Sequence, residues 1–414
     1  MKAILHSGDF PVQNRKIIIG GSKSESNRLL ILKSLFLNIR IKSLSESDDT
    51  RVLEKSLKTL KGTVNIHHAG TAMRFLTAYY ASMEGAEITL KGSQRMHERP
   101  IGILVEALRN LGADIEYLEN EGFPPLKITG KKLTVDEVTI PADVSSQYIS
   151  ALMLIAPKLP NGLKIYLDGD TVSEAYIQMT LSLLRRIGVK ASLNNNQITI
   201  SPVEKVEEVE IAVESDWSSA SYFYSLVALS ENLKITLSHF SKDSLQGDSF
   251  LPEIYKVFGV QTDFNTAENS INLYKQEVIL PNRVTLDLSN TPDLAQTIAV
   301  TCFGMGIACN LTGLQTLKIK ETDRLSALKK ELSKLGAVIT IDDNSLQLER
   351  SSGILPNPSI ETYEDHRMAM AFAPLAVKTD LIIEDAQVVS KSYPEFWKDL
   401  KMTGINCDLK DLSK

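Results

Sequence analysis

The stretch LKKELSKLGAVITIDDNSLQLER, residues 328–350, contains the pattern on which the fold depends. Leucines with helical spacing lead to a glycine, and the residues after it alternate between apolar and polar on both sides of a polar turn. A glycine at this place is typical of a left-handed helix C-cap, and the alternation is typical of a hairpin. We therefore predict a helix, a strand, a turn and a second strand.

The same pattern occurs in three other segments and, in degenerate form, in a fourth. The full copies are VEALRNLGADIEYLENEGFPPLKITG (105–130), LSLLRRIGVKASLNNNQITISP (181–202) and YKVFGVQTDFNTAENSINLY (255–274), and the degenerate copy is VLEKSLKTLKGTVNIHHAG (52–70). Such self-similarity along the chain indicates a repeat architecture.

A second pattern lies between these units, namely a few small or polar residues followed by an apolar helix of about three turns. Its six copies are GSKSESNRLLIL (21–32), AGTAMRFLTAYYA (69–81), VSSQYISALMLIA (144–156), SDWSSASYFYSLVAL (215–229), NTPDLAQTIAVTCFG (290–304) and YEDHRMAMAFAPLAV (363–377). After the first interval the copies begin roughly every 70 to 75 residues. Helices that are apolar nearly all round are buried, so we expect their N-termini to converge on a cleft.

Six copies predict an α/β fold with two pseudo-symmetric halves, each made of three βαβαββ-like units. We place one domain at residues 21–213 and the other at 214–414, with residues 1–20 pairing into the second. The segment SPVEKVEEVEIAVESD (201–216) is typical of a strand that leads into the fourth buried helix. A pair of crossing strands is therefore expected to connect the domains, with the ligand cleft between them.

The composition narrows the class of protein. The chain has 414 residues, of which 43% are hydrophobic and 23% charged, and its formal net charge of −6 argues against a general binder of nucleic acids or anionic membranes. Cys302, Cys309 and Cys407 have neither metal-ligand spacing nor a disulfide framework. No apolar stretch approaches a membrane span, and the first ten residues lack a signal-peptide core. We expect a cytoplasmic protein.

Cations recur at the starts of the buried helices, although the helix dipole disfavours them there by roughly 0.3–1 kcal/mol. Two further segments, SQRMHERP (93–100) and KIKETDRL (318–325), add cations beside predicted helix starts, the first of them at Pro100. A single such side chain is usually solvated or salt-bridged, but repetition at equivalent places favours an anionic ligand with several phosphate and carboxylate groups. The eight cations are Lys23, Arg28, Arg74, Arg95, Arg99, Lys320, Arg324 and Arg367.

Two carboxylates lie among these cations. Asp293 follows a Thr-Pro helix start, and Glu321 lies between two of the cations. Taken alone, each acid would be interpreted as one that interacts with the helix dipole or forms a salt bridge. As a pair they suit proton transfer, in which one acid accepts a proton from a hydroxyl and the other donates a proton to carbon. Hydroxyls and an amide for a polyhydroxylated substrate are supplied by Ser145, Ser146, Gln147, Ser173 and Tyr176. Serine is common at helix caps, so this set alone is weak support.

Several other mechanisms lack their motifs in this sequence. It contains no Walker loop GxxxxGK[ST], no nucleophile elbow GxSxG and no HExxH. The adjacent His67 and His68 are a poor fit to a closed zinc site.

Eleven motifs, in this order, resemble those of the 5-enolpyruvylshikimate-3-phosphate synthase family. They are GSKSESNR, SESDDTR, AGTAMR, RMHERPIG, VSSQ, GDTVSEAYI, SSASYF, QGD, PDLAQTIA, KETDRL and DHRMAM. The resemblance covers essentially the whole chain and implies two inverse α/β domains that close like a hinge. It implies a monomer that transfers the enolpyruvyl group of phosphoenolpyruvate to the 5-hydroxyl of shikimate 3-phosphate, through a tetrahedral intermediate and with release of phosphate. This is the penultimate step towards chorismate, and no metal or organic cofactor is implied.

The resemblance also implies the role of each residue. Asp293 is the base on the attacking hydroxyl, Glu321 donates the proton to the methylene carbon, and Lys23 contacts both substrates. The residues implied for shikimate 3-phosphate are Lys23, Ser24, Arg28, Ser145, Ser146, Gln147, Ser173, Tyr176, Asp293, Thr316 and Lys320. The residues implied for phosphoenolpyruvate are Lys23, Gly70, Arg99, Gln147, Arg324, Arg367 and Lys391.

Four positions depart from the commonest family pattern. His68 and Thr316 replace asparagines, Phe75 replaces a proline and Gln387 replaces a lysine, whose charge Lys391 is expected to supply. Two alternatives stay open. One is the related transferase acting on UDP-N-acetylglucosamine, which usually carries a reactive cysteine in its first half, whereas no cysteine here precedes Cys302. The other is a non-catalytic anion-binding paralogue.

Overall fold

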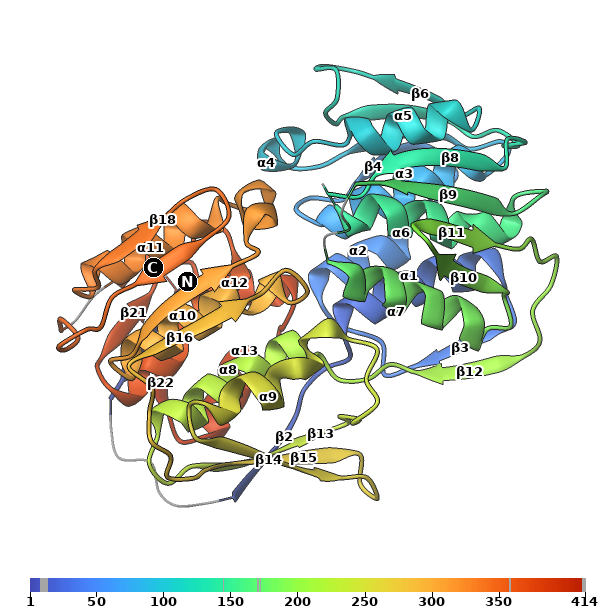
Figure 1. Cartoon of the computed structure of the whole chain (residues 1–414). Coiled ribbons are helices and arrows are strands. Elements are labelled where there is room, and N and C mark those ends of the chain that lie inside the picture. The colour runs from blue at the N-terminus through green and yellow to red at the C-terminus, as the bar shows by residue number, and fades with distance from the viewer. Residues whose placement is uncertain (8–13, 144, 170, 172, 357–358, 412–414) are drawn as a thin grey trace. The chain divides into compact units, whose positions relative to one another are not determined.

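The computed structural model describes residues 1–7, 14–143, 145–169, 171, 173–356 and 359–411. The chain divides into two compact units (Figure 1). One is Gly21–Val213, called the central unit below, and the other combines Met1–Gly20 with Glu214–Lys414 and is called the terminal unit. Within the described residues, no helix has the length and apolarity that a membrane crossing requires.

The central unit contains two four-stranded sheets of the same topology and a smaller third sheet. The first has the order β4 (Lys61–Asn65), β5 (Glu87–Lys91), β7 (Leu126–Thr129), β6 (Asp114–Tyr117), and the second the order β8 (Glu137–Pro141), β9 (Leu163–Asp168), β11 (Gln197–Ile200), β10 (Ala191–Asn194). In each, the first pair is parallel and the other pairs are antiparallel. The third sheet pairs β12 (Val209–Ala212) in parallel with β3 (Ile39–Lys42).

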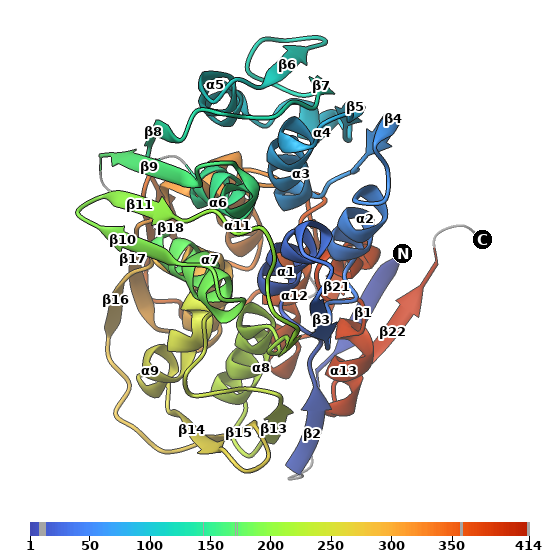
Figure 2. The same cartoon turned by 90° about the vertical axis from the view of Figure 1, so that its right-hand side faces the viewer.

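Three largely buried helices form the interior of this unit, and the less buried helices lie around them. In chain order the helices are α1 (Lys23–Leu35), α2 (Asp48–Ser56), α3 (Gly70–Ser82), α4 (Gln94–His97), α5 (Gly102–Asn110), α6 (Ser146–Ile155), η1 (Ala156–Lys158) and α7 (Glu174–Arg186). Helix α1 packs against α2, α3, α6 and α7 (Figure 2). Helix α3 buries every residue except Thr71 and Ser82. A helix that is apolar on all sides needs neighbours on all sides, and the surrounding helices and sheets provide them.

The terminal unit repeats this plan with three four-stranded sheets. Their orders are β2 (Asn14–Ile18), β13 (Lys234–Ser238), β15 (Ser270–Lys275), β14 (Val260–Asn265); then β16 (Arg283–Asp287), β17 (Ala308–Thr312), β19 (Leu346–Leu348), β18 (Ile339–Ile341); and β20 (Ser359–Ile360), β21 (Leu381–Ile383), β1 (Lys2–His6), β22 (Asn406–Lys410). The first strand of the chain therefore completes the last repeat, because β1 pairs with β21 and β22.

The interior of the terminal unit is again helical. Its helices are α8 (Trp217–Leu229), η2 (Gly247–Phe250), α9 (Leu251–Lys256), η3 (Pro292–Leu294), α10 (Ala295–Gly304), η4 (Gln315–Ile319), α11 (Arg324–Lys334), α12 (His366–Phe372), η5 (Ala373–Val377), η6 (Ala386–Lys391) and α13 (Phe396–Met402). Helices α8, α10 and α12 pack together, and α12 buries all of its residues. Helix α8 buries every residue except Ser218, which lies near its N-terminus.

The chain passes from one unit to the other twice, each time directly after a strand. Strand β2 completes a sheet of the terminal unit, yet the helix that follows it, α1, belongs to the central unit. Strand β12 does the reverse, because α8 follows it in the terminal unit. At the first of these passages a Cβ on Gly21 would lie 2.0 Å from the backbone oxygen of Ser43, so only glycine fits there.

The expected helix–glycine–hairpin pattern is confirmed at its four full copies. The glycines that follow their helices all have positive φ, namely Gly112, Gly188, Gly259 and Gly336. The prediction for the degenerate copy at 52–70 is wrong, because Gly62 lies inside β4 and that single strand belongs to the next sheet. The predicted helix start at Pro100 is also wrong, since α5 begins at Gly102.

Candidate active site

The start of α1 brings Lys23 against an acid of α2. The Lys23 ammonium lies 3.1 Å from a carboxylate oxygen of Asp49, and both side chains are largely buried. Further bonds join the two helix starts, because the Ser26 hydroxyl accepts from the backbone N–H of Ser45 and the Thr50 hydroxyl donates to the Asn27 amide. The motifs GSKSESNR and SESDDTR thus form one structure that fixes the position of the lysine. Ser24 lies on the same first turn, partly exposed.

Arg28 joins three buried helices of the central unit. Its guanidinium donates to the hydroxyl of Thr180 on α7 (2.8 Å), to the hydroxyl of Ser150 on α6 (3.0 Å) and to the backbone oxygen of Ser24 on α1 (2.9 Å). Its charge also lies over the rings of Phe75 and Tyr176. Burial lowers the pKa of Arg28 to about 10. Its hydrogen-bond partners are neutral, so a nearby anion would stabilise this charge.

Three other predicted positions lie at the N-termini of α6 and α7. Ser145 is the N-cap of α6, where its hydroxyl accepts from the N–H of Gln147, and Ser146 is buried in the first turn. Ser173 precedes α7 with a φ of 56°, and its side chain forms no capping bond. A non-glycine residue in this region is uncommon and is often found at functional sites. Arg28 contacts the backbone oxygen of Tyr176 in the first turn of α7 and the hydroxyl of Ser150 on α6, so α1 is in contact with both of these helices.

Gly70 allows Arg99 to approach the start of α3. A Cβ at Gly70 would lie 2.6 Å from a guanidinium nitrogen of Arg99, and Arg99 is buried. Two other cations in this region do not lie where the helix-start prediction placed them. Arg74 lies one turn into α3 and donates to the backbone oxygens of Gly70 and Pro100, while Arg95 pairs with Glu98 at the surface. Neither is therefore assigned to the site.

Arg324 is the centre of a second cluster, in the terminal unit. Its side chain is only 2% exposed and contacts three carboxylates: Asp293 at 2.9 Å, Glu321 at 2.9 Å and Asp365 at 2.7 Å. Burial alone would lower the pKa of Arg324, but the three acids, Asp365 foremost, raise it above its ordinary value. The guanidinium therefore stays charged and fixes the carboxylates around it.

Two more cations complete this cluster. Arg367, on the first turn of α12, lies 3.0 Å from a carboxylate oxygen of Asp293, and Lys391, at the end of η6, lies 3.0 Å from one of Glu321. The candidate base and the candidate acid are thus each held between two cations. Lys391 is buried beside Glu321, whereas Gln387 is exposed.

The remaining predicted positions, Thr316 and Lys320, lie on η4 and directly after it. The hydroxyl of Thr316 is buried and has no hydrogen-bond partner among the described residues. Asp365 and Asp49 were not predicted as site residues, although each contacts a predicted cation. The sequence offered one indication for Asp365, because an aspartate directly before a predicted helix is a favoured N-cap. In the structure it is the N-cap of α12, and its carboxylate accepts from the N–H of Arg367. Nothing in the spacing of Asp49 marked it.

The clusters are suited to anions. In the part of the chain that the structure describes, no group of three or more His, Cys, Asp and Glu side chains could hold a metal ion. The buried guanidinium groups instead offer bidentate donors for phosphate and carboxylate.

Comparison with known proteins identifies the family to which the chain belongs. Residues 63–400 match the family model described as EPSP synthase (3-phosphoshikimate 1-carboxyvinyltransferase). The chain belongs to the EPSP synthase family. A 3-phosphoshikimate 1-carboxyvinyltransferase from Bacteroides fragilis is 46% identical over 392 residues, which are 94% of this chain and 95% of that protein. One from Colwellia psychrerythraea is 34% identical over an alignment of 424 positions, gaps included, that covers 95% of this chain and 97% of that protein.

The EPSP synthase family is a family of transferases in aromatic amino acid biosynthesis, so the prediction of an enzyme is confirmed. The fold prediction is confirmed as well. EPSP synthase from Acinetobacter baumannii matches with a TM-score of 0.76 at 20% identity, over 99% of this chain and 100% of that one. At this identity the match concerns the fold alone.

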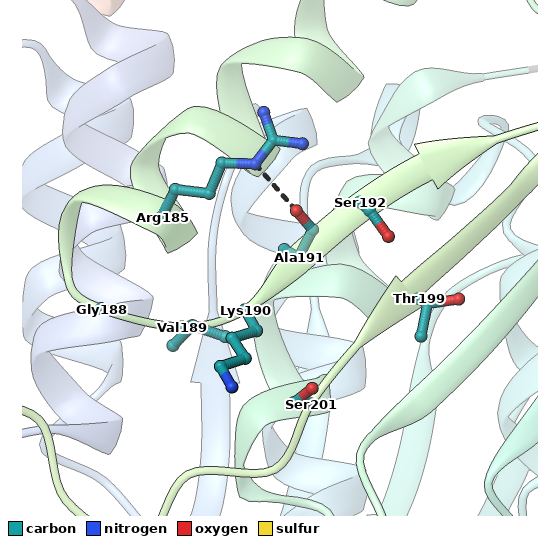
Figure 3. Close-up of a pocket in the computed structure, with 8 residues that line it drawn as sticks. All are labelled: Arg185, Gly188, Val189, Lys190, Ala191, Ser192, Thr199 and Ser201. Carbon is teal, nitrogen blue, oxygen red and sulfur yellow. Dashed lines mark hydrogen bonds between the residues drawn. The ribbon is translucent and has the colours of Figure 1, made fainter.

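A surface hollow of about 460 Å³ lies away from the positions expected for an EPSP synthase site (Figure 3). It is formed by the end of α7 with β10 and β11, whereas Tyr176 lies near the start of α7. Arg185 donates to the backbone oxygen of Ala191, and its guanidinium and the Lys190 ammonium point in opposite directions. The hollow thus has no convergent set of polar groups, and we assign it no role.

Asp248, in the QGD motif, adds a pH-sensitive carboxyl beside the cluster of the terminal unit. It accepts a hydrogen bond from the Ser218 hydroxyl, which in turn accepts from Arg367 at 3.3 Å. Burial, with a contribution from the charge of Asp293, raises the pKa of Asp248 from 3.8 to about 7. The folded protein therefore binds a proton between about pH 4 and pH 7 that the unfolded chain releases, and stability falls as the pH rises through this window.

Replacement of Asp248 by asparagine is expected to remove this pH dependence. The difference in unfolding free energy, Asp248→Asn minus wild type, should rise by about 2–4 kcal/mol between pH 4.5 and pH 8. Urea unfolding followed by the fluorescence of Trp217 and Trp397, both in the terminal unit, measures it. Parallel pH curves for the two proteins would contradict the assignment.

Proposed function

We propose that this chain transfers the enolpyruvyl group of phosphoenolpyruvate to the 5-hydroxyl of shikimate 3-phosphate with the residues of the two clusters. The observation that carries the proposal is the arrangement around Arg324, which holds Asp293 and Glu321 on one guanidinium. Such an arrangement provides two carboxylates at fixed positions, each in contact with two cations, as a reaction with a proton acceptor and a proton donor requires.

In the proposed addition step, Asp293 accepts the proton of the 5-hydroxyl while the hydroxyl oxygen forms a bond to C2 of phosphoenolpyruvate. Glu321 donates a proton to C3, which converts the methylene to a methyl group and gives the tetrahedral intermediate. Elimination then returns one methyl proton to Glu321, the C2–O bond to phosphate breaks, and the proton that Asp293 took from the 5-hydroxyl leaves with the phosphate. One enolpyruvyl group is transferred and one inorganic phosphate is released.

The cations are proposed to bind the anionic groups of phosphoenolpyruvate. In the terminal unit three cations, Arg324, Arg367 and Lys391, contact three carboxylates. A bound phosphate or carboxylate would add negative charge to this balanced set, and the cations would be shared between ligand and protein. In the central unit we assign Lys23, Gly70, Arg99 and Gln147 to the same substrate, Gly70 because it leaves room for the guanidinium of Arg99.

The central unit is proposed to provide most contacts to shikimate 3-phosphate. The buried charge of Arg28, which has neutral hydrogen-bond partners, and the uncommon backbone of Ser173 support this assignment. In the terminal unit the hydroxyl of Thr316, which has no hydrogen-bond partner within the described parts of the chain, supports a contact to the same substrate. The complete proposed set is Lys23, Ser24, Arg28, Ser145, Ser146, Gln147, Ser173, Tyr176, Asp293, Thr316 and Lys320. We further propose that the enzyme acts in the cytoplasm as a monomer without a cofactor.

The deciding experiment mixes the protein with shikimate 3-phosphate and phosphoenolpyruvate and measures inorganic phosphate. We expect release that depends on both substrates and does not occur when UDP-N-acetylglucosamine replaces shikimate 3-phosphate. Binding of both ligands by calorimetry without release of phosphate would instead identify a non-catalytic anion-binding protein.

A further inference from the structure

A buried acid outside the predicted site, Glu331, contacts the segment that leads into α12. It lies on α11 and its side chain is fully buried. One carboxylate oxygen accepts from the hydroxyl of Tyr363, and the other accepts from the backbone N–H of Glu361 at 3.1 Å and from the Lys334 ammonium at 2.6 Å. Two of its three contacts are therefore to the residues directly before the N-cap of α12.

Those residues adopt an unfavourable backbone conformation. Tyr363 and Glu364 have φ angles of 54° and 55° in succession. L-residues with large side chains rarely enter this left-handed region, and two in a row persist only where surrounding contacts determine them. The contacts of Glu331 lie at and just before this turn, so they oppose its relaxation, together with the hydrogen bond from the Asp365 N–H to the Thr362 oxygen.

The turn determines where two members of the cluster lie. Asp365 follows Glu364 directly, caps α12 and accepts from Arg324, while Arg367 lies two residues further on, in the first turn of the helix. Helix α11 therefore holds this segment at two places, through Arg324 at its first residue and through Glu331 about two turns later. A relaxed turn would move Asp365 and Arg367 relative to Arg324.

We propose that Glu331 is a positioning residue for the transfer reaction, acting through Tyr363 and the left-handed turn on Arg367. The inference rests on the proposed function, in which Arg367 binds phosphoenolpyruvate. It differs from a purely structural role in one respect: loss of the contact impairs the binding of phosphoenolpyruvate specifically, and does not only lower stability.

The test compares Tyr363→Phe, which removes only the hydroxyl that reaches Glu331, with Tyr224→Phe. The control removes the hydroxyl of another tyrosine of the same unit, which bonds to Thr262. For Tyr363→Phe we expect KM for phosphoenolpyruvate to rise about tenfold, with KM for shikimate 3-phosphate changed less than twofold. For Tyr224→Phe both values should stay at the wild-type level. Glu331→Gln, which keeps an acceptor oxygen but loses the charge, should raise KM in the same direction.

A second measurement separates this inference from the proposed function. Hydrogen–deuterium exchange of the backbone amides of residues 361–368 reports on the turn without any substrate. We expect exchange there to be at least about tenfold faster in Tyr363→Phe and unchanged in Tyr224→Phe. If the wild-type protein releases no phosphate, the proposed function fails while the exchange result still tests the positioning. If Tyr363→Phe equals Tyr224→Phe in both KM and exchange, the inference is wrong.

Discussion

Asp293→Ala is expected to reduce phosphate release from shikimate 3-phosphate and phosphoenolpyruvate by about 1,000-fold, while the protein stays folded. Loss of a positioned general base typically costs 10²–10⁴-fold in rate. The fold should survive because Arg324 retains Asp365 and Glu321 after the substitution. Phosphate release at saturating substrates measures the rate, and the circular dichroism spectrum reports the fold.

Asp263→Ala is the matched control for this experiment. It removes an exposed aspartate on β14 in the same unit and should leave the rate within about twofold of wild type. A rate for Asp293→Ala within tenfold of wild type would exclude Asp293 as the base. Binding of phosphoenolpyruvate should be checked in parallel, because Arg367 loses its carboxylate partner in the variant.

Most of the fold could be predicted from the repeat pattern, because each element of the pattern depends only on neighbouring residues. A glycine such as Gly336 ends a helix through its own backbone, and the alternation after it defines a hairpin without reference to the rest of the chain. The prediction for the degenerate copy at Gly62 failed because it depended on contacts between distant segments. The positive φ of Gly62 occurs inside β4, and whether that strand pairs with the preceding or the following segment depends on tertiary contacts.

The site was less accessible to sequence reasoning because ion pairs depend on the fold. Asp293 and Arg367 are far apart in the chain, and they come within 3.0 Å because α10, which directly follows the short helix of Asp293, packs against α12. Asp49 could not be found because its role depends on a contact with Lys23 on another helix. Conversely, Arg74 looked like a helix-start cation, yet it lies one turn further along and binds backbone oxygens.

Replacement of Arg324 by methionine is expected to lower the unfolding free energy of the terminal unit by about 3–5 kcal/mol, because it leaves buried carboxylates without their shared cation. Asp365 is the most affected, since its side chain is fully buried and its contact with Arg324 is 2.7 Å long. Urea unfolding followed by tryptophan fluorescence measures the loss, because Trp217 and Trp397 both lie in this unit.

Arg283→Met provides the comparison for this loss. Arg283 lies on β16 of the same unit and forms a 2.7 Å ion pair with Glu349, but both side chains are about half exposed. Exposed pairs contribute little, so we expect a loss below about 1 kcal/mol and full activity. If the two variants lost equal stability, burial would not be what makes Arg324 important, and its three carboxylate contacts would have no more effect than a single surface pair. If Arg324→Met lost stability as expected but still bound phosphoenolpyruvate as tightly as the wild type, Arg324 would organise the acids without contacting the substrate.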